Sequence, residues 1–205
     1  MRPWLNCKLS EQQQKDPRYA EVLLVPPTVT IDQRTILDCG DLQLELIPTP
    51  GHCPDHIAIW IPDIRHLFTG DAAESPFLYV ADAAMLPLLI QSLELLAGLD
   101  AEITLPCHGG TTDPQLINRN LRYFEAVREH CLQAIKNGVL PDDWMNAQNL
   151  ADIVGMQYED ALEIAGADPE QTPYMYREFH KEVIKAMIPT QVGKPREEAP
   201  PAERE

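Results

Sequence analysis

The sequence lacks long apolar runs and is poor in basic residues. No stretch of its 205 residues approaches the roughly 20 apolar residues that a membrane-spanning helix needs. Lysine and arginine number 16 against 32 aspartates and glutamates, which gives a formal net charge of −16. Because such a surface repels phosphate backbones and anionic lipids, we expect neither a nucleic acid nor a membrane as a partner.

Cysteine is scarce, and its spacing shows no metal or disulfide pattern. The five cysteines are odd in number and include no CxxC pair, which fits reduced thiols better than a disulfide framework. The first residues also lack the apolar core of a secretory signal. We therefore expect a cytoplasmic protein. Cys53 and Cys107 are expected to be small buried residues.

Several catalytic signatures are missing as well. The chain has no G-x-S-x-G nucleophile elbow, no phosphate-binding loop and no G-x-G-x-x-G turn. The sequence therefore offers no catalytic nucleophile and no nucleotide-binding residue.

What the sequence does contain is a series of short strand-like runs followed by helical patterns, an α/β (α+β) arrangement. The run at 56–61 is apolar on both faces, so we expect it to be covered on both sides. Other runs predict strands at 21–27, 28–31, 41–47, 66–70 and 101–105, and residues 35–40 lead into the strand at 41–47. Three- and four-residue spacing predicts helices at 86–99, 113–136, 147–154, 158–165 and 173–188.

These patterns divide the chain into four parts. Residues 1–20 are polar and read as a flexible lead-in, and residues 21–138 contain the strands and a long amphipathic helix. Residues 139–192 form a helical C-terminal extension. Residues 193–205 have no apolar side chain larger than alanine and are expected to be disordered.

Three residues of metal-ligand type share one context. His52, Asp71 and His108 each come just after a strand-like run, where a rigid sheet can hold a side chain that a loop exposes. Imidazole and carboxylate are the ligands of zinc, manganese or iron rather than calcium. The sequence therefore suggests a metal site, and the competing interpretation is three satisfied polar residues at sheet ends.

The motifs around these residues resemble those of a known family. Thr49-Pro-Gly-His-Cys-Pro-Asp-His56, then Leu67-Phe-Thr-Gly-Asp71, then Leu105-Pro-Cys-His-Gly109 are similar to the last three metal motifs of the metallo-β-lactamase superfamily, in that order. The resemblance covers residues 21–134. It implies an αββα sandwich with two metals, zinc in a complete site or alternatively iron or manganese, at one edge.

Carried over by position, the resemblance implies a role for each residue. His52 would bind the first metal, Asp71 would bridge both, and His108 would bind the second. His56 falls where the family has a residue that is usually not a direct ligand, so a supporting role is expected.

One motif of the family is absent from this chain. The sequence His-x-His-x-Asp-His, which supplies the other four metal-site side chains, occurs nowhere. The chain thus looks like the truncated C-terminal half, or somewhat more, of a full-length enzyme, with an incomplete sandwich. Two protein ligands per ion fall short of the three usual at a catalytic zinc, so we expect weak metal binding and impaired hydrolysis.

Two functions follow. The first is a metal-dependent hydrolase of metallo-β-lactamase type acting on an ester, thioester, lactone or similar bond of a small-molecule substrate. The alternative is a noncatalytic binding or assembly protein that retains half of the fold. In either case a half-sandwich leaves an apolar sheet face, so a homodimer or a partner chain covering the sheet is expected.

Overall fold

The computed structural model describes residues 3–80 and 82–192, so the expected disordered tail at 193–205 lies outside the described residues. The chain divides into two compact units, the first ending at Asp32 and the second beginning at Gln33. No helix within the described ranges is both long and apolar enough to cross a bilayer.

The first unit contains helix α1 (Pro3–Lys15) and a 3-10 turn, η1 (Pro17–Tyr19). The expectation of a lead-in without secondary structure over residues 1–20 was therefore wrong. Residues 4–15 contain neither glycine nor proline, and eight of these twelve residues are leucine, glutamine, lysine or glutamate, which all favour a helix.

The strands expected at 21–27 and 28–31 do not form. Residues 22–34 are irregular, and Leu23 and Val25 are 82% and 83% exposed. Apolar β-formers make a strand only beside a partner strand, and Pro26 and Pro27 have no N–H to offer one. The strand-bearing unit consequently begins at Gln33 rather than at residue 21.

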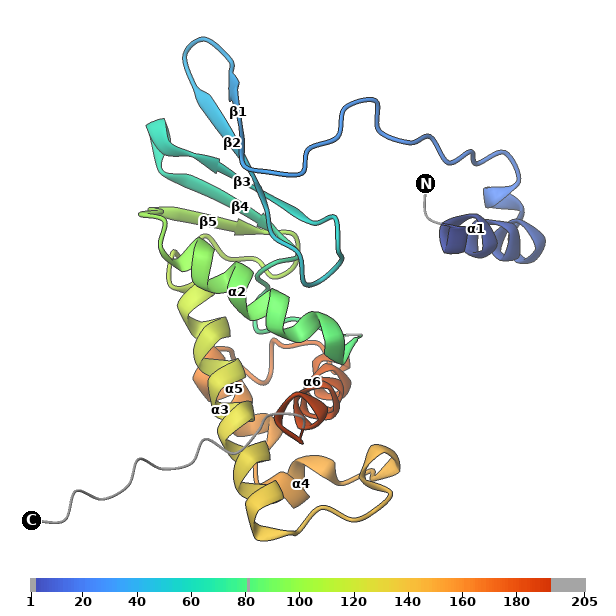
Figure 1. Cartoon of the computed structure of the whole chain (residues 1–205), viewed down its shortest axis with the longest axis vertical. Helices are drawn as coiled ribbons and strands as arrows, with labels where there is room; N and C mark the ends of the chain where they lie inside the picture. Colours follow the sequence, from blue (N-terminus) through green and yellow to red (C-terminus); the bar gives the residue numbers. More distant parts are fainter. Residues whose placement is uncertain (1–2, 81, 193–205) are drawn as a thin grey trace, which may run out of the picture. The chain divides into compact units, whose positions relative to one another are not determined.

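The second unit is built on one five-stranded sheet with the strand order β1-β2-β3-β4-β5 (Figure 1). The first four strands run antiparallel to one another in sequence, and β5 runs parallel to β4. Four of the five were expected from the sequence, the exception being the first. The strands are β1 (Thr35–Asp38), β2 (Gln43–Pro48), β3 (Ile57–Ile61), β4 (His66–Gly70) and β5 (Ile103–Pro106).

The loops between strands follow from backbone geometry. A 3-10 turn, η2 (Pro62–Ile64), reverses the chain between β3 and β4, and Arg65 closes it in the left-handed conformation. Parallel strands need a crossover, and the chain makes one through η3 (Ala83–Met85) and helix α2 (Leu86–Ala97). Helix α2 begins where expected, because Pro87 is tolerated only in a first turn.

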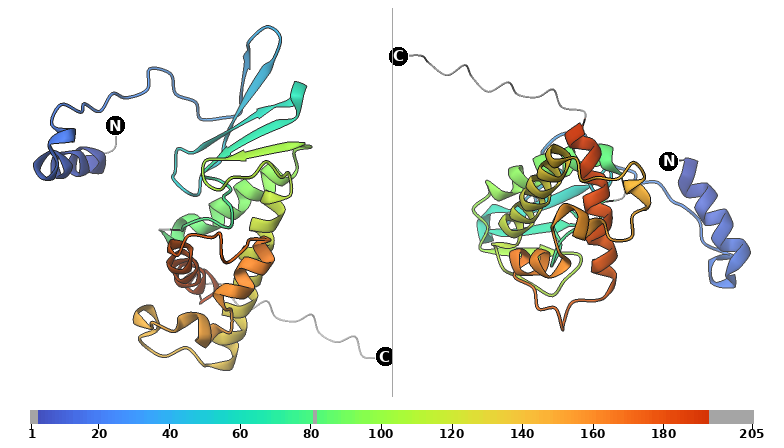
Figure 2. Two further views of the ribbon diagram at one scale, coloured as in Figure 1. Left: turned by 180° about the vertical axis from the view of Figure 1, so that it is seen from behind. Right: turned by 90° about the horizontal axis from the view of Figure 1, so that it is seen from below.

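A layer of helices follows, and Figures 1 and 2 show α2 beside the sheet, α3 extending away from the sheet and α6 farther from the sheet than α2. Helix α3 starts three residues after the expected Asp113, which instead accepts a 2.8 Å hydrogen bond from Gln115 N in a turn. The layer belongs to the same compact unit as the sheet. Its members are α3 (Leu116–Asn137), η4 (Trp144–Asn146), α4 (Leu150–Val154), α5 (Tyr158–Ala165) and α6 (Met175–Val192).

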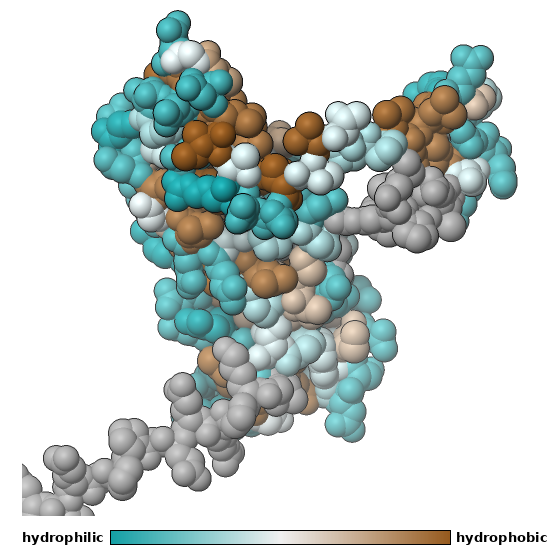
Figure 3. Space-filling model, turned by 45° about the horizontal axis from the view of Figure 1, so that its top comes forward, coloured by the Kyte–Doolittle hydropathy of each residue, from teal (hydrophilic) through white to brown (hydrophobic). Residues whose placement is uncertain are grey.

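The two faces of the sheet differ. Side chains directly opposite on neighbouring strands share a face, and the row of Trp60 and Leu67 is buried. On the other face Phe68 is 41% exposed, and Figure 3 shows apolar side chains exposed over the strands. The expectation that the 56–61 strand is covered on both sides was wrong at its start, where Ile57 is 39% exposed, whereas Ile61 at its end is buried. The open face carries Leu46, Ile57, Ile59, Phe68 and Leu105.

An aromatic cluster fills the core of the helical layer. Phe77, which follows β4, stacks on Tyr123 of α3 with ring centroids 4.2 Å apart. Tyr158 and Tyr176 meet the same ring edge-on. His180 joins the cluster: Tyr123 Oη lies 2.9 Å from its Nδ1, and its Nε2 donates to the Met156 carbonyl.

Candidate metal centre

His52 lies in the loop after β2, and helix α2 fixes that loop. Gly51 has a φ of 153°, and a Cβ there would lie 2.4 Å from Leu89 Cα, so only glycine permits this approach. Ser92 Oγ on the same helix donates a 2.7 Å hydrogen bond to the Pro50 carbonyl. The crossover helix therefore sets the position of His52.

Asp71 follows β4 directly, where the sheet ends. Gly70 has a φ of 55°, and a Cβ there would lie 2.7 Å from His56 Nε2. The Ala72 amide donates to the Thr69 carbonyl, which closes a turn around the aspartate. Asp71 is thus held at the rim of the sheet by a turn that leaves no space for a larger residue before it.

His108 occupies the corresponding place after β5. The Cys107 amide donates to the Gly70 carbonyl, which keeps the ends of β4 and β5 together. Gly109 has a φ of 86°, and a Cβ there would lie 2.5 Å from the Cβ of Ser75. The loop that carries His108 therefore packs directly against the segment that follows Asp71.

The structure brings these three side chains together. His108 Nε2 lies 3.4 Å from Asp71 Oδ1, and His52 Nε2 lies 3.9 Å from Asp71 Oδ2. The two imidazole side chains are 64% and 35% exposed, respectively. One carboxylate thus stands between two accessible imidazoles, with a different oxygen toward each.

This arrangement fits part of a metal centre. Asp71 Oδ1 is buried without any hydrogen-bond partner among the described residues, and a bound cation would supply the missing partner. Within residues 3–80 and 82–192, however, no three His, Cys, Asp or Glu side chains are grouped so as to hold an ion on their own. Any ion at this place would therefore need further ligands.

His56 supports Asp71 and is not available to a metal. Its Nε2 accepts a 3.0 Å hydrogen bond from the Asp71 amide, so the ring proton is on Nδ1, which donates to Thr49 Oγ1 at 2.7 Å. Burial lowers the pKa of His56, and the charge of Asp71 opposes this shift in part. A neutral ring suits both bonds. The supporting role of His56 at a metal site stays a prediction.

The cysteines beside the two histidines differ from expectation. Cys107 is exposed and Cys53 is partly exposed, so neither is the small buried residue that we predicted. Both lie in loops at the sheet rim rather than inside strands, which explains their accessibility. Burial raises the pKa of the Cys107 thiol, and the charges of Asp71 and Glu74 raise it further.

Sequence reasoning missed Glu74, a buried acid near the three side chains. It is 6% exposed, and its carboxyl receives a hydrogen bond from Tyr176 Oη. A signal was present in the sequence, since Glu74 is the only charged residue in the apolar segment 72–80.

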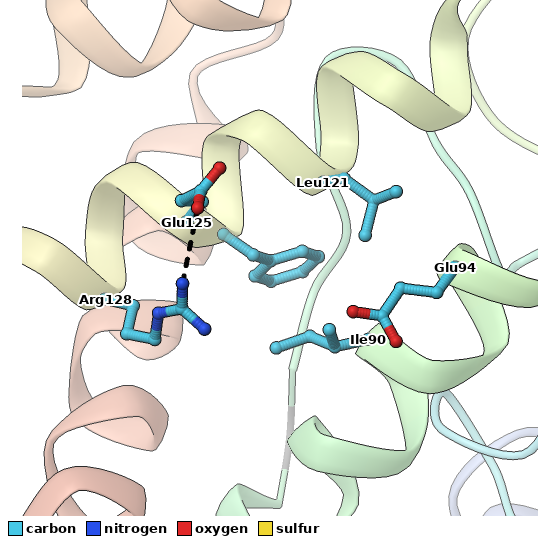
Figure 4. Close-up of a pocket in the computed structure, with 6 residues that line it drawn as sticks. Ile90, Glu94, Leu121, Glu125 and Arg128 are labelled. Carbon is cyan, nitrogen blue, oxygen red and sulfur yellow. Dashed lines mark hydrogen bonds and ion pairs between the residues drawn. The ribbon is translucent and has the colours of Figure 1, made fainter. Parts of the chain in front are cut away.

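Two hollows in the surface lie away from this site. One, of about 230 Å³, opens between α2 and α3, where Arg128 pairs with Glu125 at 3.3 Å beside Ile90 and Leu121 (Figure 4). The other, of about 550 Å³, adjoins it and reaches the end of α6. Neither includes His52, Asp71 or His108, so the hollows do not mark the candidate metal centre.

Comparison with known proteins places the chain in a family. The sequence model of the Metallo-beta-lactamase superfamily matches residues 1–108, more than half of the chain. A metallo-beta-lactamase family protein from Thermus thermophilus has a similar fold, with a TM-score of 0.53 at 20% identity over 83% of this chain and 51% of that one.

Two curated relatives are hydroxyacylglutathione hydrolases. The one from Hahella chejuensis is 35% identical over 106 residues, which cover 49% of this chain and 38% of the relative. The one from Mesorhizobium japonicum is 31% identical over 83 residues, which cover 38% and 31%. The match thus spans well under half of either relative. Together, the family match over residues 1–108 and the shared fold show that the chain belongs to the metallo-beta-lactamase superfamily.

Proposed function

We propose that this chain supplies part of the metal centre of a metal-dependent hydrolase. The observation that carries this proposal is the placement of the Asp71 carboxylate between the imidazoles of His52 and His108. The resemblance assigns His52 to one ion, His108 to a second and Asp71 to both. Zinc is the first choice for such donors, with iron or manganese as alternatives.

The residues of this chain hold and orient the site. His56 fixes the Asp71 backbone through its Nε2, and Thr49 holds the other side of that ring. Ions bound at such a site polarise a carbonyl group and make water a stronger acid. Because these residues give each ion two ligands, we propose that hydrolysis needs further ligands and that this chain alone hydrolyses poorly.

We propose thioesters as the substrate class. The support is that two curated relatives are hydroxyacylglutathione hydrolases, whose named substrate is a thioester. Hydrolysis of a thioester and of a lactone, each with added zinc, compares this class with another bond that the superfamily cleaves.

A second candidate is a noncatalytic binding or assembly protein. The open face of the sheet favours it, since apolar side chains from four strands are left partly exposed there in the described structure. A partner chain or a second copy would bury this face. The two candidates differ in outcome, because only the hydrolase gains activity when a partner and zinc are both supplied.

Metal binding tests the site directly. In Asp71→Asn we expect Co²⁺ affinity to fall by at least about 100-fold, more than the loss of a supporting residue usually costs. Visible absorption during a Co²⁺ titration measures the affinity. Asp113→Asn, which removes an acid paired with Arg119 at 2.7 Å, is the matched control. Equal binding by the two variants would refute Asp71 as a ligand.

A further inference from the structure

Glu74 is the only acidic side chain that is buried among the described residues. A buried carboxyl group costs free energy unless strong partners compensate it, and a well-packed neutral residue is often more stable in its place. The hydrogen bond that Glu74 Oε1 receives comes from a neutral phenol, Tyr176 Oη. Stability alone therefore gives little reason for an acid at this position.

Two helices fix Glu74 from opposite ends of the residue. Asn120 on α3 holds its backbone, accepting from Glu74 N at 3.0 Å and donating to Glu74 O at 2.9 Å. The same amide group also donates to the Pro76 carbonyl. Tyr176 on α6 holds the side chain. The direction of the carboxyl group is thus determined by the helical layer.

The segment that contains Glu74 connects both sides of the candidate metal centre. It begins at Asp71, and Glu74 follows that residue closely in the chain. The Ser75 amide donates to the His108 carbonyl at 3.3 Å, and the Cβ of Ser75 fills the space in front of Gly109. A shift of this segment would therefore move Asp71 and His108 relative to each other.

The side chains of the candidate metal centre also interact electrostatically with Glu74. Burial is the main cause that raises the pKa of its carboxyl, and the hydrogen bond from Tyr176 opposes it. The charges of His108, Asp71 and His52 each shift the same pKa. A negative charge on Glu74 would thus act on any cation held by those three residues.

We propose that Glu74, held by Tyr176, is a positioning residue for the metal centre, fixing the segment 71–76 and adding negative charge near the ligands. Helix α6 then sets the metal affinity of a site at the rim of the sheet. This inference rests on the proposed function, because it takes Asp71 and His108 as ligands.

Three variants of the full chain distinguish the effect of the Glu74 charge, the effect of its hydrogen bond to Tyr176 and a general loss of core stability. Glu74→Gln keeps an acceptor for Tyr176 but removes the charge. Tyr176→Phe keeps the ring and removes the hydrogen bond to Glu74. Tyr123→Phe is the matched control, because it removes another buried hydroxyl of the same core, one that bonds His180 instead of Glu74. Each is titrated with Co²⁺ and followed by visible absorption and thermal unfolding.

We expect Glu74→Gln and Tyr176→Phe to weaken Co²⁺ binding by about tenfold or more. Glu74→Gln should do so without lowering the unfolding temperature, an outcome that a merely structural role does not produce. Tyr123→Phe should lower the unfolding temperature and leave the affinity and spectrum unchanged. If Tyr176→Phe does not fold, Glu74→Gln decides the result alone.

The Co²⁺ titrations distinguish failure of the proposed function from failure of the inference about Glu74. If the wild-type chain binds no Co²⁺, the proposed function and this inference are both overturned. If Co²⁺ binds through Asp71 but the Glu74 and Tyr176 variants bind it as tightly as Tyr123→Phe, the inference alone is overturned.

Discussion

The helical layer and the sheet use the same residue types in opposite ways. In the helical layer, His180 has both ring nitrogens bonded, and Phe77 is completely enclosed by other side chains. At the sheet rim, His108 is 64% exposed and Asp71 Oδ1 has no hydrogen-bond partner in the described part of the chain. On the open face of the sheet, Phe68 is partly exposed.

The contrast separates groups that stabilise this chain from groups that are directed outward. Buried polar groups in folded proteins nearly always have partners, so an unpartnered one at a rim indicates a site for something else. Large exposed apolar patches similarly indicate a binding surface. Whether the polar atoms of a side chain have hydrogen-bond partners, rather than the residue type, therefore distinguishes the structural histidines from the candidate ligands.

The largest expected effect on stability lies in the helical layer. Phe77→Ala should lower the free energy of unfolding by about 3–5 kcal/mol, because it leaves a cavity between Tyr123, Tyr158 and Tyr176. Chemical denaturation measures the change. Phe68→Ala is the matched control and should cost about 1 kcal/mol or less. Equal losses in both variants would remove the contrast between the two regions.

An intermediate effect concerns pH and His180. Burial lowers the pKa of His180 despite its hydrogen bond to Met156, so the unfolded chain binds more protons below about pH 6.5. The free energy of unfolding should therefore fall as the pH drops from about 6.5 toward the folded-state pKa, by at most about 1.4 kcal/mol per pH unit for this one group.

His180→Gln tests this pH dependence, since its amide can still donate to the Met156 carbonyl and does not titrate. Its loss of stability between about pH 6.5 and 5 should be smaller than in the wild type. Some loss remains, because the pKa of His56 is lowered as well, while the raised pKa of Glu74 acts in the opposite direction. Identical pH profiles would show that His180 is not protonated on unfolding.

The smallest expected effect concerns the open face of the sheet. If a second copy covers this face, Phe68→Ser should weaken self-association by about fivefold, corresponding to about 1 kcal/mol. Sedimentation velocity over a range of concentrations measures it. Leu132→Ser, at a similarly exposed position on α3, is the control. A wild-type chain that stays monomeric at all concentrations would exclude a homodimer and leave a different partner chain as the proposal.

Much of the fold was predictable because local patterns determined it. Four of the five strands, β2 to β5, were expected from alternation and from turns at glycine and proline, and Gly138 ends α3 as its position suggested. Strand predictions were wrong where a strand would have needed a neighbouring strand to pair with. The apolar run 21–27 remains irregular, because no strand in the described structure pairs with it. Helix α1 was missed because a polar composition was taken for a lack of structure.

The sequence by itself determined the residue types at the ends of β2, β4 and β5 and the glycines that allow those loops to turn. It also determined the resemblance to the metallo-beta-lactamase superfamily, because the motifs lie in short continuous segments. Only the tertiary structure decided that His56 is fully bonded, that Asp71 Oδ1 is not, and that Glu74 is held by Tyr176. Those contacts join residues up to 102 positions apart, and no local pattern encodes them.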